Sequence, residues 1–153
     1  MDIEKLIKKY IIIKNTERYT EVDVQQLQEF NTNLGCTCAG EIFLNISLPQ
    51  EIKEAIILKE LLINEGYTGY ILARRIIKNW EFKRYITIKT HELVERKLKE
   101  KLRDYNINTN IRVNDYSFIG YYFMLYKLLY GDQKTFKMLR KCYGNLLEPP
   151  KTV

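Results

Sequence analysis

The sequence predicts a mostly helical α+β domain with a small three-stranded sheet. Apolar residues recur at helical spacing over most of the chain, whereas three separated segments alternate with the period of two that strands show. The chain has only three prolines among 153 residues, and no linker or repeat divides residues 1–147. We therefore expect a single domain over 1–147 and a C-terminal tail over 148–153.

The first fifty residues are expected to form two helices and one strand. Helical spacing predicts a helix over 2–13 and a weaker one over 21–31. Residues 41–48 alternate between apolar and polar side chains, which predicts a strand that Pro49 ends. The side chains expected on the apolar faces of these elements are Ile3, Leu6, Ile7, Tyr10, Val24, Leu27, Phe30, Ile42, Leu44, Ile46 and Leu48.

A helix, a short turn and a second helix are expected next. Pro49 favours the start of a helix, and acidic side chains follow in its first turns, where the helix dipole favours them. This helix extends to about Asn64, because Gly66 is placed to end it. Thr68 is placed to cap a second helix over 69–79.

Two more strands and the remaining helices fill the second half of the chain. Residues 82–88 are rich in aromatic and β-branched side chains and predict a strand. Helical spacing predicts a helix over 91–105, and residues 107–113 then alternate like a third strand. A closing helical pair is expected over 116–143, with a break near Gly131.

Positive charge is concentrated in residues 67–103, which hold eleven basic and four acidic side chains. Residues 1–50 hold five basic and seven acidic side chains, and the whole chain carries a formal charge of +6. A basic supersecondary unit suits a polyanion, because each neutralised phosphate releases counterions. We therefore expect a DNA-binding regulatory or accessory protein, against the alternative of an ordinary solvated helix face. The residues expected to contact nucleic acid are Arg74, Arg75, Lys78, Lys89, Arg96, Lys99, Arg103 and Arg112.

The order of elements over 51–113 resembles that of winged helix-turn-helix domains. The turn Gly66-Tyr67-Thr68-Gly69-Tyr70 is similar to the glycine-aromatic turn before the second helix in some of them. The resemblance implies that the helix over 91–105 enters the major groove. A wing normally needs two strands after that helix, so residues 82–88 would have to pair with 107–113.

A second resemblance concerns two segments, the strand over 42–48 and the helical stretch Leu58-Lys59-Glu60-Leu61-Leu62-Ile63. Together they resemble the strand and metal-binding helix of small zinc metallopeptidases of the kind that cleave phage repressors. That family carries His-Glu-x-x-His, with two imidazoles one turn apart on zinc. Lys59 and Ile63 occupy the two histidine positions here and cannot bind zinc, so the resemblance does not imply peptidase activity.

Catalytic motifs are weak in this sequence. Glu81 and Lys83 match the Glu-x-Lys half of a restriction-nuclease motif, in which a carboxylate holds Mg²⁺ and a lysine helps to activate water. The second carboxylate that the motif needs is missing upstream, so a metal-dependent nuclease is only the third hypothesis. We expect no catalytic function, no cofactor and no metal site, because the spacings of the three cysteines and of His91 match no zinc motif.

The segment 116–130 is unusually aromatic, with seven aromatic residues among fifteen. A helix that is apolar all round is normally buried or at an interface. We expect it in the core, or in a homodimer or protein-partner contact formed by Tyr121, Tyr122, Tyr126 and Tyr130. The second hypothesis is accordingly a protein-binding regulator or inhibitor, of the kind that a phage or mobile element encodes. The absence of a signal peptide and of a long apolar run predicts a cytoplasmic protein that does not enter a membrane.

Overall fold

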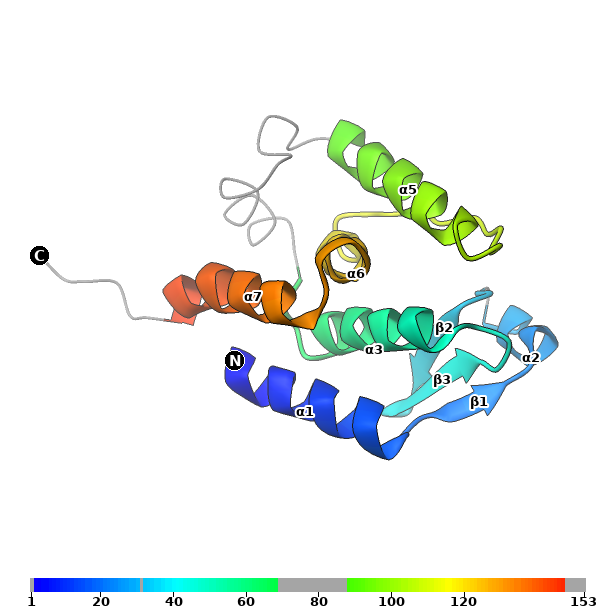
Figure 1. Ribbon diagram of the computed structural model, residues 1–153, viewed down its shortest axis with the longest axis horizontal. Coiled ribbons are helices and arrows are strands. Elements are labelled where there is room, and N and C mark those ends of the chain that lie inside the picture. The colour runs from blue at the N-terminus through cyan, green and yellow to red at the C-terminus, as the bar shows by residue number, and fades with distance from the viewer. Residues whose placement is uncertain (1, 31, 69–87, 148–153) are drawn as a thin grey trace, which may run out of the picture.

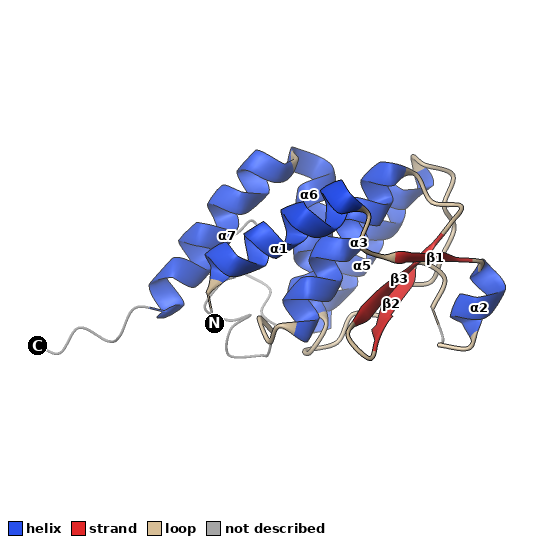
Figure 2. Ribbon diagram, turned by 90° about the horizontal axis from the view of Figure 1, so that it is seen from below, coloured by secondary structure: helices blue, strands red, loops and turns tan. Residues whose placement is uncertain are grey.

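The structure is a mostly helical α+β fold with a small three-stranded sheet, as the sequence predicts. The sheet is mixed and lies at one end of the fold (Figures 1 and 2). The computed structural model describes residues 2–30, 32–68 and 88–147. Six helices and three strands lie within these residues. Helix α3 occupies the middle of the fold, with α1 on one side and α6 on the other, and α5 lies beyond α6 (Figure 1).

Helix α1 (Ile3–Thr16) covers one side of α3. Asp2 caps it, because its side chain accepts a hydrogen bond from the backbone N–H of Glu4 at 2.9 Å. The helix ends at Glu17, which takes the left-handed conformation with φ 50°. All four apolar residues expected to point inward from this helix are buried, and Ile13 joins them.

The sheet has the strand order β1-β3-β2. Strand β3 (Glu41–Asn45) pairs in parallel with β1 (Thr20–Val22) and antiparallel with β2 (Gly35–Cys38). Ala39 and Gly40 join β2 to β3 with φ angles of 51° and 80°, and two positive φ angles define a type I′ hairpin turn. Gly35 is required on β2, because a Cβ there would lie 2.7 Å from the carbonyl oxygen of Phe43.

Helix α3 (Gln50–Asn64) is the most deeply buried element. Pro49 occupies its N-cap, and Gly66 follows its end with φ 83°, as the sequence predicts. Its apolar residues point to the sheet on one side and to α6 on the other, so almost every position from Ile52 to Leu62 is buried.

Three further helices complete the described fold. Helix α5 (Ile88–Arg103) packs on α6 (Phe118–Tyr130), and α7 (Asp132–Leu147) lies against α6 and α1. The expected break between the last two helices falls at Gly131, whose φ is 83°. The phenol of Tyr143 donates a buried hydrogen bond to the carbonyl of Tyr67, which ties α7 to the end of α3.

The prediction of a strand over 107–113 is wrong. These residues have no regular secondary structure, although Ile111 and Val113 are buried and their neighbours are exposed. The alternation of apolar and polar residues therefore reflects packing of one side of the segment against the core, not pairing with another strand. The backbone N–H of Val113 donates to the carboxylate of Glu95 at 2.6 Å instead of to a neighbouring strand. The segment thus does not form the wing that the winged-helix resemblance requires.

Two smaller expectations also differ from the structure. Helix α2 (Val24–Gln28) is only five residues long, and of its expected inward residues Leu27 is buried while Val24 and Phe30 are exposed. Strand β3 ends before Ile46, which is exposed, because Ser47 and Leu48 already turn toward α3 through hydrogen bonds to Asn45.

The sheet strands β1 and β2 were not anticipated from the sequence. They have three and four residues, which is too short for an alternating pattern to stand out. The helix expected over 69–79, the strand expected over 82–88 except for Ile88, and the tail over 148–153 lie outside the described residues.

Candidate functional site

The positions that resemble a zinc motif lie on the side of α3 that faces α6. A Cβ built on Gly120 of α6 would come within 2.8 Å of Ile63 and 3.0 Å of Lys59. The backbone of α6 therefore lies directly against the two side chains that replace the histidines. This close helix contact fills the space that a metal ion between these positions would need. No group of three potential metal ligands is found among the described residues.

Lys59 is a buried charge with a fixed set of partners. Only 5% of the residue is exposed, its Nζ lies 3.0 Å from the Glu60 carboxylate, and it sits 4.7 Å from the ring centroid of Tyr121. Burial disfavours the charged form, but the negative charge of Glu60 and the hydrogen bonds with Glu60 and Tyr121 outweigh it and raise the pKa of Lys59. The ammonium group thus remains charged and joins α3 to α6.

The carboxylate of Glu60 is engaged by neighbouring groups on α3 and β2. It accepts a hydrogen bond from the Thr37 hydroxyl at 3.0 Å, and the Asn64 amide donates to the same hydroxyl at 2.8 Å. With Lys59 on its other side, this carboxylate is held by the protein itself rather than turned toward a substrate. The cluster of Thr37, Lys59, Glu60, Asn64 and Tyr121 is therefore a structural joint between sheet and helices.

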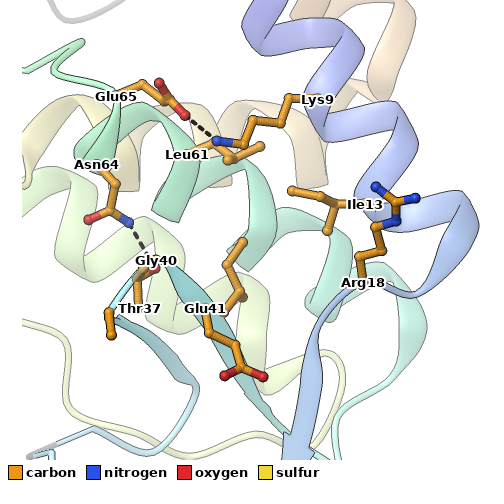
Figure 3. Close-up of a pocket in the computed structure, with 11 residues that line it drawn as sticks. Lys9, Ile13, Arg18, Thr37, Gly40, Glu41, Leu61, Asn64 and Glu65 are labelled. Atoms are coloured by element: carbon orange, nitrogen blue, oxygen red, sulfur yellow. Dashed lines mark hydrogen bonds and ion pairs between the residues drawn. The ribbon is translucent and has the colours of Figure 1, made fainter.

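A cavity of about 420 Å³ opens between α1, the β2–β3 hairpin and the end of α3 (Figure 3). Its charged groups mostly neutralise one another within the protein. Lys9 pairs with Glu65, and the carboxylate of Glu41 accepts a hydrogen bond from Thr20. Arg18 projects along the opposite wall beside Ile13 (Figure 3). We assign no ligand to this cavity, because its carboxylates are already engaged by Lys9 and Thr20 and only Arg18 is left without a side-chain partner among the described residues.

Helix α5 carries the described part of the basic surface that the sequence predicts. Its core side is formed by Val94, Leu98 and Leu102, which are all buried. The opposite side presents Arg96, Lys99 and Arg103, interleaved with two glutamates. These acidic neighbours are Glu92 and Glu100, both exposed on the same side of the helix. The outer face of α5 is therefore a mixed-charge face, and Arg112 belongs to the extended segment that follows this helix.

A more uniformly basic surface runs over α1 and α7, which lie side by side (Figure 2). The two helices together contain eight basic and two acidic residues. Two contacts set their alignment: Arg140 pairs with Glu4 at 2.6 Å, and Lys14 pairs with Asp132 at 2.6 Å. The exposed lysines left over form what we call the α1–α7 surface: Lys5, Lys8, Lys134, Lys137 and Lys141.

The α1–α7 surface has few acidic neighbours, and those nearest to Lys5 are Asp2 and Glu65, which line a pocket with it. Both acidic residues of these helices are already engaged, and none of its five lysines forms an ion pair with a described residue. Lys134, Lys137 and Lys141 follow one another at spacings of three and four residues, so they share one face of α7. Lys134 also lies 5.7 Å from the ring centroid of the exposed Tyr130. The basic side chains of this surface are therefore interleaved with fewer acidic ones than those on the outer face of α5.

Most of the aromatic segment 116–130 lies in the hydrophobic core. Tyr122 is only 4% exposed and Phe123 is fully buried, because α6 is covered by α3, α5 and α7. Tyr121 and Tyr126 are half-buried, and Tyr130 is exposed at the end of the helix. Of the four tyrosines considered for a partner interface, only Tyr130 presents a large surface to solvent.

Several residues considered from the sequence lie outside the described part of the chain. They are Arg74, Arg75, Lys78, Glu81 and Lys83. Lys89 belongs to the first turn of α5.

Comparison with known proteins gives no relative: no protein-family model, no curated protein and no solved structure matches this chain. Within the described residues, every helix is either too short or too polar to cross a bilayer.

Proposed function

We propose that the protein binds DNA through the α1–α7 surface. The observation that carries the proposal is that five exposed lysines lie on two adjacent helices whose only acidic residues are already paired. Lysines in this arrangement can each approach a phosphate without first breaking an ion pair. The release of counterions from the DNA then drives association.

The ion pairs beneath the surface hold the two helices in register. Asp132 accepts hydrogen bonds from Lys14 and Tyr10, both of α1, and also pairs with Lys127 of α6 at 3.1 Å. Because these contacts are partly buried, they keep the lysines of α1 and α7 on a common rigid support. A preformed surface loses less conformational entropy on binding than a mobile one.

Binding to a fluorescent duplex, measured by anisotropy at several salt concentrations, tests this proposal. The triple variant Lys8→Gln, Lys137→Gln, Lys141→Gln should weaken binding at least tenfold. It should also reduce the slope of log affinity against log salt by about 3, because three fewer phosphates are neutralised. All three side chains are exposed, so the fold is expected to remain, which circular dichroism checks.

A matched control comes from α5. The triple variant Arg96→Gln, Lys99→Gln, Arg103→Gln removes the same charge from the mixed-charge face, and it should leave the affinity within about twofold. Loss of binding in this control alone would overturn the assignment to α1 and α7 and return it to α5. Absence of salt-dependent binding in the unmodified protein would overturn the function itself.

A further inference from the structure

A second cavity, of about 340 Å³, lies where the segment before β2, the extended segment after α5 and helix α6 meet. We call it the Arg112 cavity. Three parts of the chain form its walls: residues 32–34 before β2, the extended segment 109–112, and Tyr121 of α6. Its size falls within the range of small-molecule sites.

The walls of the Arg112 cavity are held together by side-chain contacts. The amide of Asn33 donates to the Thr109 hydroxyl at 3.4 Å, which bridges two of the three walls. The backbone carbonyl of Asn33 also accepts from the amide of Asn45 at 3.0 Å, so the first wall is anchored to β3. The ring of Tyr121 is held by the ammonium group of Lys59, which lies 4.7 Å from its centroid.

The chemistry of the lining differs from that of the larger cavity beside α1. Among the described residues that line the cavity, Arg112 is the only charged one, and none carries a carboxylate. Its guanidinium is exposed and forms no ion pair with a described residue. The remaining polar groups are uncharged: two asparagine amides, from Asn33 and Asn110, and the hydroxyls of threonine and tyrosine.

We propose that the Arg112 cavity binds a nucleoside monophosphate. A guanidinium matches the phosphate in charge and in paired geometry. Asparagine amides carry a donor and an acceptor side by side, as the edges of nucleobases do. Tyr121 supplies an aromatic ring for the base. This site is separate from the α1–α7 surface and does not depend on DNA binding there.

Isothermal titration calorimetry of the full chain tests the site with AMP and CMP as probes. We expect one equivalent of at least one of these nucleotides to bind. Adenosine, cytidine, ribose 5-phosphate and inorganic phosphate should each bind at least tenfold more weakly, because each lacks either the phosphate or the base. Equal binding of ribose 5-phosphate would overturn the role of the base, and equal binding of inorganic phosphate would overturn the nucleotide assignment.

Variants locate the binding on the protein. Arg112→Gln should weaken the nucleotide at least tenfold, and Asn110→Ala should weaken it about threefold. Arg103→Gln, which removes an exposed guanidinium from α5, should have no effect. The triple lysine variant of the α1–α7 surface should retain nucleotide binding, which separates this proposal from DNA binding. Failure of both nucleotides to bind, or binding that Arg112→Gln leaves unchanged, would overturn the proposal.

Discussion

Gly120 determines how closely α6 approaches α3. The absence of a side chain lets the α6 backbone lie against Ile63 and the aliphatic part of Lys59. A larger residue would push the two helices apart and disturb the buried pair of Lys59 and Glu60.

We expect Gly120→Ala to lower the free energy of unfolding by about 1–2 kcal/mol. The steric cost of the added methyl group exceeds the gain in helix propensity of about 1 kcal/mol. Urea denaturation measures the change. Gly144→Ala on α7 is the matched control, because a Cβ there meets no atom within 4 Å, and it should be neutral or stabilising. Equal stability of both variants would contradict the close approach of the helices.

The lysines of the α1–α7 surface do not stand out in the sequence, for a specific reason. In the net charge of residues 1–50, the four lysines of α1 are cancelled by the acidic residues that follow the helix. Glu17 ends α1, and the other four acidic residues lie in or beside the short elements that follow: Glu21, Asp23, Glu29 and Glu41. Charge summed over single helices shows α1 and α7 as basic, but their adjacency depends on tertiary packing.

The β2–β3 hairpin shows how a turn sets the register of a small sheet. Its two central residues both have positive φ, and Ala39 takes this conformation at a steric cost that asparagine largely avoids. The register places Thr37 on the face toward α3, where it reaches Glu60.

Ala39→Asn should therefore raise the free energy of unfolding by about 0.5–1 kcal/mol, because Asn-Gly is the preferred pair for this turn. Thermal denaturation followed by circular dichroism measures the effect. Gly40→Ala should act in the opposite direction, since its φ of 80° suits glycine. A decrease in stability on Ala39→Asn would show that the hairpin does not have this turn.

The elements differ in how well the sequence predicts them. Long amphipathic helices were predicted to within a few residues, because their buried stripes repeat over several turns. The segment 107–113 shows where this kind of prediction fails. The sequence predicts its alternating burial correctly, but it does not show whether the backbone of the segment pairs with another strand, because that depends on the rest of the fold. The DNA site expected on residues 74–112 stays a prediction: Arg74, Arg75 and Lys78 lie outside the described residues, and the others belong to α5 and to the extended segment after it.

At the scale of the whole molecule, Asp132 links four helices. Its carboxylate contacts Lys14 and Tyr10 of α1 and Lys127 of α6, and Lys14 also pairs with Glu54 of α3 at 3.3 Å. Burial raises the pKa of Asp132, but the hydrogen bond from Lys14 and the charge of Lys127 outweigh it and hold the pKa below the ordinary value.

Asp132→Asn should lower the free energy of unfolding at pH 7 by about 2 kcal/mol, the scale of a hydrogen-bonded charge. A carboxyl group with a lowered pKa in the folded state stabilises the protein above its ordinary pKa of 3.8. This contribution disappears as the pH falls through the folded-state pKa. The difference between the two proteins, measured by urea denaturation from pH 7 to pH 2.5, should therefore shrink below about pH 4. A difference that is constant with pH would contradict the role of this carboxylate.

The central position of α3 also affects how the protein is made. The N-terminal elements leave the ribosome before α6, so the side of α3 that α6 will cover is still open to solvent during translation. Residues 1–68 alone therefore expose the apolar side of α3 to water or to a chaperone. The side of α3 that faces α6 can be covered only after Phe118–Tyr130 has been synthesised, so we expect it to stay exposed until late in translation.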